Sequence, residues 1–304
     1  MFINVLTQVI ILLLLILTGF VLTKGKVLTE NGVKSMTDMV LLLVTPCVII
    51  KSFIREFDKD VLKSLLISFL IAILVHIGFI LVSLLIKADD KAKQKVLQFG
   101  VIFSNCGYMS IPLQQALLGD TGVFYGSSFI AIFNIFVWSY GIILMSGDKK
   151  YLSPKKLIIN PGMIGIVIGL IIFLFSIPVP KILSEPVSYL ASLNTPLPMI
   201  IIGYHLAHSS LLNGIKSLKC IIAIAMKLVI LPAAALGIMY LCGIRGTMLI
   251  SSVISCSAPS AAITTMFSSK FGADTDMSVN MVSLSTVLSL LTMPLLITLT
   301  QYIA

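Results

Sequence analysis

Residues Phe103-Ser104-Asn105-Cys106-Gly107-Tyr108-Met109-Ser110-Ile111-Pro112 lie in the middle of an apolar segment that is long enough to cross a membrane. Asn, Gly, Ser and Pro disfavour an uninterrupted helix in lipid. A second stretch of the same character, Ser255-Cys256-Ser257-Ala258-Pro259-Ser260, interrupts a later apolar segment. Two interrupted hydrophobic segments at corresponding places in two halves of a chain are typical of the binding site of a transporter.

The composition excludes an ordinary soluble protein. Hydrophobic residues make up 58% of the 304 residues and charged residues 11%, whereas soluble domains carry roughly 25% charged residues. The formal net charge of +9 is explained by basic loops rather than by a nucleic-acid partner. The five cysteines are scattered, which predicts neither a disulfide framework nor a metal site. We therefore expect an all-α integral membrane protein.

About 20 apolar residues are needed to cross the hydrocarbon core, and the sequence predicts ten such spans. Their ranges are 4–23, 36–54, 62–86, 96–118, 122–146, 159–178, 186–209, 218–241, 246–268 and 278–301. The longest connection is polar and basic. It divides the chain into a first five-helix repeat (1–147), a cytoplasmic linker (148–158) and a second five-helix repeat (159–304).

The loop charges predict the orientation. Fourteen of the 21 Lys and Arg residues fall in loops after odd-numbered spans, and five fall in loops after even-numbered spans. Because cytoplasmic loops are enriched in Lys and Arg, the first set is expected in the cytoplasm. The sequence thus predicts a multi-pass protein of the plasma membrane, with both termini outside.

The two halves of the chain carry prolines at corresponding positions. Thr45-Pro46 in span 2 corresponds to Thr195-Pro196 in span 7, at an offset of 150 residues. Pro112 and Pro259, which are expected to break spans 4 and 9, are 147 residues apart. With five spans in each repeat, the second copy enters the membrane from the opposite side. We therefore predict an inverted repeat whose broken helices 4 and 9 cross near the midplane.

A broken helix exposes free N–H groups at the start of one half-helix, which favours a carboxylate there. Asn105 can donate and accept hydrogen bonds, and Ser104, Ser257 and Ser260 add hydroxyl donors. The alternative is that these small polar residues only allow helices to pack closely.

Ionisable residues within the spans are few. Asp38 lies near the start of span 2, and the other Asp and Glu residues fall in predicted loops. His76, within span 3, is the candidate for proton coupling, with a structural hydrogen bond as the alternative. Lys51 is expected to extend to the outer surface. Lys227 either extends inward or provides a positive potential for an anion.

Searches for enzyme motifs find nothing. The chain has no Walker sequence, dinucleotide fingerprint, HExxH or GxSxG motif. We predict neither an enzyme nor a cofactor.

Residues Asn105 to Leu113, followed by Gly119-Asp120, resemble the fourth-helix signature of the auxin efflux carrier family, Asn-x-Gly-(aromatic)-x-Gly-Ile-Pro. The segments Ala258-Pro259-Ser260-Ala261 and Ser283–Ser289 are similar to its ninth and tenth helices. Two residues depart from the pattern: Ser110 stands where Gly is usual, and Ala258 stands where Met is common. The chain lacks the long central loop of many plant members, so it resembles a bacterial permease of the inner membrane.

The resemblance implies a scaffold and a transport domain that work by an elevator-type motion, with a small organic anion bound at the crossing. Bacterial relatives are associated with dicarboxylates such as malate and malonate, and the family includes homodimers. By this likeness Asn105, Tyr108 and the residues around Pro112 and Pro259 are substrate contacts. The predicted function is thus a permease for a small carboxylate. The alternatives are a sodium-coupled organic-anion symporter of the bile-acid type and, less favoured, a channel or membrane receptor.

Overall fold

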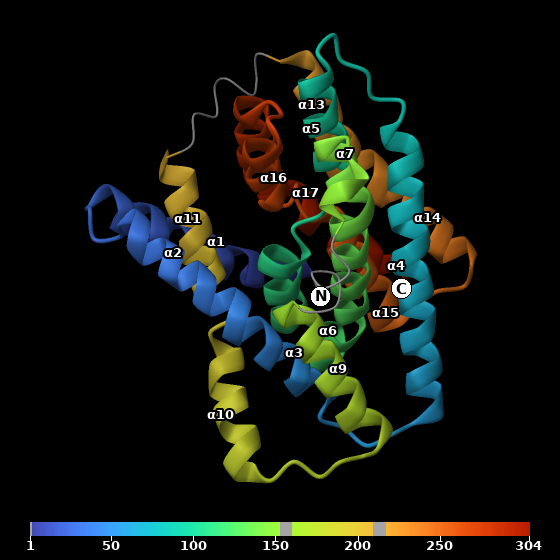
Figure 1. Ribbon diagram of the computed structural model, residues 1–304. Helices are drawn as coiled ribbons and strands as arrows, with labels where there is room; N and C mark the ends of the chain where they lie inside the picture. The colour runs from blue at the N-terminus through green and yellow to red at the C-terminus, as the bar shows by residue number, and fades with distance from the viewer. Residues whose placement is uncertain (1, 153–159, 209–216) are drawn as a thin grey trace.

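The computed structural model describes residues 2–152, 160–208 and 217–304, and they form helices joined by short connections (Figure 1). These ranges leave out part of the predicted linker, the first residue of predicted span 6 and the last residue of predicted span 7. Lys155, Lys156 and Lys216 also lie outside the described residues. The chain is therefore an all-helical multi-pass membrane protein.

Five helical stretches among the described residues are long and apolar enough to cross a membrane: Glu30–Phe53, Lys59–Ser83, Cys106–Ser146, Leu218–Leu241 and Thr275–Ile303. Predicted spans 7 and 9 each consist of two shorter helices, and predicted span 4 is divided between the helix Lys91–Ile102 and the start of the long stretch Cys106–Ser146. The helices of the first half are α1 (Phe2–Lys24), α2 (Glu30–Met39), α3 (Thr45–Phe53), α4 (Lys59–Ser83), α5 (Lys91–Ile102), α6 (Ile111–Phe136) and α7 (Ile142–Ser146). Those of the second half are α9 (Pro161–Leu174), α10 (Lys181–Ser192), α11 (Pro196–His208), α13 (Leu218–Ala225), α14 (Leu231–Leu241), α15 (Gly246–Ser257), α16 (Ile263–Phe271) and α17 (Thr275–Ile303).

Three π-helical turns each end two residues before a proline. They are η1 (Val40–Val44) before Pro46, η2 (Cys106–Ser110) before Pro112, and η5 (Met226–Ile230) before Pro232. Proline has no N–H and its ring clashes with the carbonyl four residues earlier, so the preceding turn widens. Span 2 thus passes Pro46 without a break, whereas span 7 is interrupted between α10 and α11.

The break in span 4 differs in position from the predicted one. The chain leaves the helix at Phe103, whose backbone is extended (φ −96°, ψ 112°), while Pro112 lies in the first turn of α6. Gly119, expected in a loop between spans 4 and 5, is a sharp kink at positive φ (62°) inside α6. The helix resumes at Cys106, and its widened first turn η2 accommodates Pro112 without a second break.

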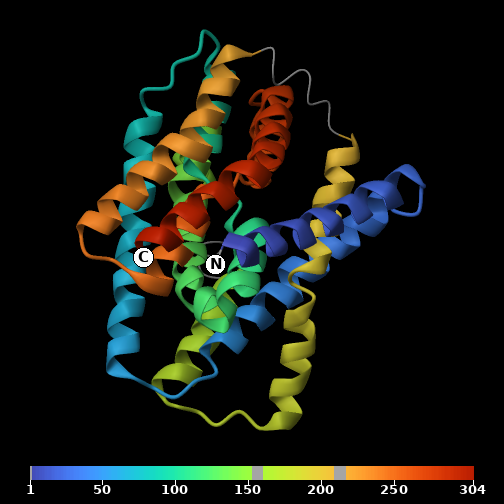
Figure 2. The ribbon, with the colours of Figure 1, turned by 180° about the vertical axis from the view of Figure 1, so that it is seen from behind.

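Two groups of helices lie on opposite sides of the molecule. Figure 1 shows α1, α2 and α11 on one side and α4 and α14 on the other, with α6 and α15 between them. The pair α1 and α11 packs through glycines: a Cβ added to Gly203 would lie 2.1 Å from the carbonyl oxygen of Ile16. On the reverse side, α17 lies beside α1 (Figure 2).

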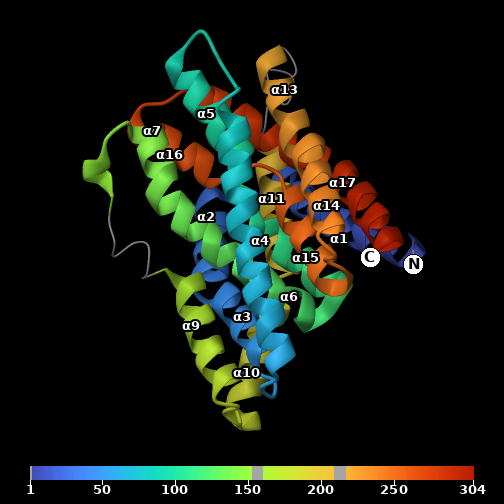
Figure 3. The same ribbon diagram turned by 90° about the vertical axis from the view of Figure 1, so that its right-hand side faces the viewer.

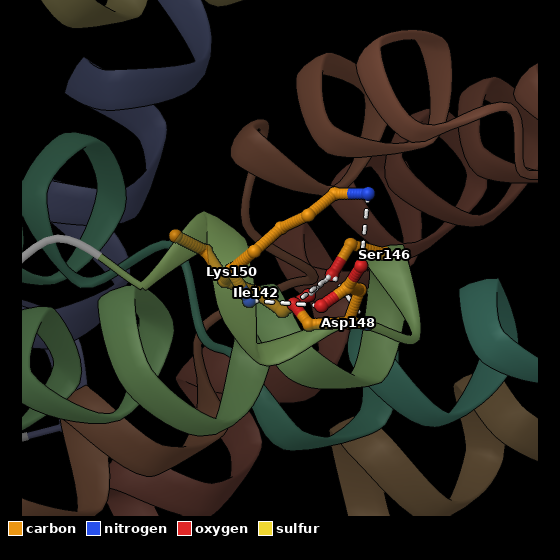
Figure 4. Close-up of polar contacts among 4 residues, drawn as sticks. All are labelled: Ile142, Ser146, Asp148 and Lys150. Atoms are coloured by element: carbon orange, nitrogen blue, oxygen red, sulfur yellow. Dashed lines mark hydrogen bonds and ion pairs between the residues drawn. The ribbon is translucent and has the colours of Figure 1, made fainter.

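The basic loops gather at one end. The start of α5, the end of α7 and the start of α13 lie together there, and α9 and α10 lie at the other end (Figure 3). At the end of α7, the Ser146 hydroxyl donates to Ile142 O (2.7 Å), and the Asp148 carboxylate pairs with Lys150 Nζ (2.9 Å; Figure 4). Hydrogen bonds from Lys150 lower the pKa of Asp148.

Candidate functional site

The two interrupted segments meet and complete each other's backbone hydrogen bonds. The N–H of Asn105 donates to Pro259 O (2.7 Å), and the N–H of Ala261 donates to Phe103 O (2.9 Å). Ser104 and Ser260 form an antiparallel β-bridge, isolated among the described residues. An unpaired backbone group costs several kcal/mol in lipid, so this mutual pairing makes both breaks tolerable at membrane depth.

Serine side chains hold the crossing in place. The hydroxyl of Ser260 donates to Gly100 O (2.8 Å), and its N–H donates to the Ser285 hydroxyl (3.2 Å). The Ser104 hydroxyl lies 3.4 Å from Cys256 O. Both Ser104 and Ser260 are buried, so these groups stabilise the crossing and are not open to a ligand in this conformation.

A buried lysine contacts the crossing. Lys227 lies in η5, has no exposed surface, and donates from Nζ to the Ser104 hydroxyl at 2.5 Å. Its Nζ also lies 5.1 Å from the centre of the Phe79 ring, within the range of a cation–π contact. The sequence pattern assigned Lys227 two alternative roles. The geometry excludes the one in which the side chain extends to the membrane surface.

A cavity of about 300 Å³ opens beside the crossing. Asn105 lines the cavity, and the side chain of Asn105 makes no hydrogen bond to the described residues. Among the described residues, the lining contains amide, hydroxyl, imidazole and aliphatic groups, with no carboxylate, Lys or Arg. It comprises Asn105, Ile202, His205, Leu206, His208, Ala262, Thr265, Val279, Val282, Ser283 and Thr286.

The remaining predicted contacts lie away from this cavity. Tyr108 packs against Val33 and Ile201, and its buried hydroxyl has no partner among the described residues. Pro112 is buried in α6, and the Ser257 hydroxyl bonds to its own helix at Ile254 O (3.3 Å). Of the predicted substrate contacts, the structure brings Ser104, Asn105, Pro259 and Ser260 together, and of these Asn105 alone lines the cavity.

His76 is 2% exposed and packed among aromatic rings. It stacks on Phe136 with ring centres 5.3 Å apart and contacts Phe129 at 5.1 Å. Its Nδ1 lies 2.8 Å from Ala72 O, within its own helix. This environment matches the structural alternative, in which the histidine is hydrogen-bonded within the bundle.

Sequence reasoning did not single out the polar contacts that join α6 to α15. Gln114 donates from Nε2 to Ser251 O (3.0 Å) and to the Ser255 hydroxyl (2.8 Å). The Ser251 hydroxyl in turn donates to Gly122 O (2.9 Å). A glutamine inside an apolar span was the available signal, because a buried amide needs partners.

Comparison with known proteins identifies the family. The profile of the membrane transport protein family, to which the auxin efflux carriers belong, matches residues 4–155 and again residues 150–297. The chain belongs to this family. A profile that matches twice along one chain also suggests an internal repeat. The family member described here is thus a membrane transporter and not an enzyme.

The curated relatives include archaeal and plant members of the family. An uncharacterized transporter of Methanothermobacter thermautotrophicus is 24% identical over 94% of this chain and 95% of its own length. Another, of Methanocaldococcus jannaschii, is 24% identical over 94% of this chain and 96% of its own. Auxin efflux carrier component 1 of Arabidopsis thaliana is 27% identical over 40% of this chain and 20% of its own.

Proposed function

We propose that this transporter is a secondary carrier that moves a small organic carboxylate anion by elevator-type alternating access. The observation that carries the proposal is the amide of Asn105, which lines a cavity where the two interrupted segments meet and makes no hydrogen bond to the described residues. An amide N–H can donate to a carboxylate oxygen. The volume of about 300 Å³ suits a small ligand.

The helix starts at the crossing support an anionic ligand. The π-turn η2 begins one residue after Asn105, and α16 begins one residue after the cavity-lining Ala262. Helix N-termini carry partial positive charge, which favours an anion nearby. None of the described lining residues is Asp or Glu, so a carboxylate meets no like charge from them.

We propose ten spans in two inverted five-helix repeats, 1–147 and 159–304, joined by a cytoplasmic linker. In this arrangement the static scaffold includes α1, α3 and α11, and the moving domain carries α6, α15 and the crossing. The cavity is lined by the end of α11, near the end of the molecule where the Lys-rich loops gather. That end is cytoplasmic by the loop-charge rule. The cavity therefore faces inward in the plasma membrane, and both termini lie outside. The homodimer is proposed separately, from the family resemblance.

Sodium coupling of the bile-acid type is the competing mechanism. A sodium ion near the crossing would need oxygen ligands, and the Ser104 hydroxyl there already accepts from the Lys227 ammonium. Two positive charges at the same place repel each other. We therefore favour transport without sodium.

Flux into reconstituted liposomes tests the proposal. Labelled mono- and dicarboxylates are supplied with and without a sodium gradient, to the wild type, Asn105→Ala and the matched control Asn134→Ala. Asn134 lies in α6 outside the cavity, and its amide bonds to its own helix at Ile130 O (2.9 Å). We expect saturable, sodium-independent flux that falls at least about tenfold in Asn105→Ala and persists in the control.

Sodium-dependent flux would instead establish the symporter. Equal flux in Asn105→Ala and the wild type would remove Asn105 from the substrate site. Flux that rises linearly with concentration, without saturation or counterflow, would indicate a channel.

A further inference from the structure

Helix α11 places two histidines in the cavity wall. His205 and His208 are three residues apart, so they lie on the same face of the helix, and both line the cavity. They are the ionisable side chains in this lining. The remaining histidine of the chain, His76, is buried among aromatic rings and does not line the cavity.

The backbone that carries these histidines is held firmly. Gly203 packs directly on the backbone of α1, and Lys24 donates from Nζ to Ala207 O (3.0 Å). Nδ1 of His208 lies 3.1 Å from Tyr204 O. His205 makes no hydrogen bond to the described residues, and its ring meets the Tyr204 ring edge to face at 5.5 Å. Nitrogen atoms of both imidazoles thus remain available to a ligand.

The other described lining residues offer neutral groups only. The polar ones come from the crossing and from α16 and α17, with the Asn105 amide and the hydroxyls of Thr265 and Ser283. The Thr286 hydroxyl is already bonded to Val282 O (2.7 Å). A ligand with two acidic groups would therefore find its strongest donors at two different places: the amide at the crossing and the imidazoles on α11.

We propose that His205 and His208 are specificity-determining residues that bind a second acidic group of the substrate while a first carboxylate is held at Asn105. This inference rests on the proposed function. An imidazole N–H that donates to a carboxylate oxygen makes a charge-assisted hydrogen bond, which is stronger than a neutral one. Two such donors on the wall therefore favour an anion with two carboxylates over an anion with one.

The test compares the binding of radiolabelled malonate, with two carboxylates, and acetate, with one, to the full-length protein in detergent. The variants are His205→Leu/His208→Leu, which removes all donors, and His205→Gln/His208→Gln, which keeps an amide donor at each position. Tyr204→Phe is the control, because it removes a polar atom from the same helix outside the cavity lining. Liposome flux of malonate is measured in parallel, as KM and maximal rate.

We expect the Leu pair to raise the Kd and KM for malonate about tenfold or more. The Kd for acetate should change by less than about threefold, the Gln pair should recover part of the malonate affinity, and Tyr204→Phe should match the wild type. A selective loss of malonate affinity is a result that a merely structural defect does not produce.

Equal weakening of both anions in the Leu pair would overturn the specificity role, and so would unchanged malonate binding. In both cases wild-type flux and its loss in Asn105→Ala would leave the proposed carrier function standing. Absence of saturable binding of either anion to the wild type would overturn the inference and the proposed carboxylate function together.

Discussion

Lys227 is an ammonium group fully buried at membrane depth, and none of the ion pairs among the described residues includes it. Burying an unpaired charge is costly. The hydroxyl of Ser104 and the ring of Phe79 offset part of that cost. A residue retained at such a cost, one hydrogen bond from the crossing, is expected to serve transport by keeping Ser104 and the neighbouring Asn105 in position.

We predict that Lys227→Met lowers carboxylate flux at least about tenfold, because Ser104 loses its charged donor. The melting temperature should stay the same or rise, since a Met of similar length replaces a buried charge without leaving a cavity. Liposome flux and thermal unfolding in detergent measure the two effects. Unchanged flux at an unchanged melting temperature would show that the lysine only fills space.

For His76→Gln we predict that the pH dependence of flux is unchanged. The imidazole is bonded within its own helix and enclosed by phenylalanines, and it does not line the cavity beside the crossing. The melting temperature should fall, because the ring stacking on Phe136 is lost. The flux of the variant and of the wild type is measured from pH 5.5 to 8. A pH dependence that is flattened in the variant would support proton coupling through His76.

At the scale of elements, one ion pair links helices that the proposed mechanism assigns to different domains. Lys51 lies in the last turn of α3, and its Nζ is 3.6 Å from Asp120 Oδ1, next to the Gly119 kink of α6. Gln115 donates to the same carboxylate oxygen (3.1 Å). If α6 moves relative to α3 during transport, the pair is made in this conformation and broken in the other.

We predict that Lys51→Met shifts the protein away from the conformation described here and changes the apparent KM by at most about fivefold. The limit follows from the partial exposure of both side chains, 31% and 40%, because exposed ion pairs contribute roughly 0–1 kcal/mol. Flux kinetics of Lys51→Met, Asp120→Asn and the double variant form a double-mutant cycle. Strictly additive effects would mean that the two side chains do not act as a pair.

At the scale of the whole molecule, the proposed mechanism moves an anion without a compensating ion. The transport step is then electrogenic, and a potential of 100 mV changes its free energy by about 2.3 kcal/mol for each charge. The direction of the effect is fixed by the sign of the charge, since an inside-negative potential drives anions outward.

We therefore predict that an inside-negative potassium diffusion potential accelerates the exit of a labelled carboxylate from liposomes and that reversing the potential slows it. Protein-free liposomes and Asn105→Ala are the controls. Exit that is indifferent to the potential would indicate electroneutral coupling to another ion.

The sequence by itself determined the membrane class, the family resemblance and the existence of two interrupted helices. Hydropathy and the positions of Asn, Ser, Gly and Pro are local properties, and in lipid they act directly on helix formation. The sequence did not predict the exact position of the break in span 4. The chain leaves the helix at Phe103, and Pro112 lies further along, in the resumed helix, where the widened turn η2 accommodates it.

Only the tertiary structure decided which polar groups meet. Lys227 reaches Ser104 because η5 packs against the crossing, and His205 and His208 line the cavity because glycine contacts fix α11 on α1. The partners in these contacts are far apart in the chain, and local periodicity states only which residues share a helix face. The facing surface that a polar group meets depends on how the helices pack, which the spacing of residues within one helix does not determine.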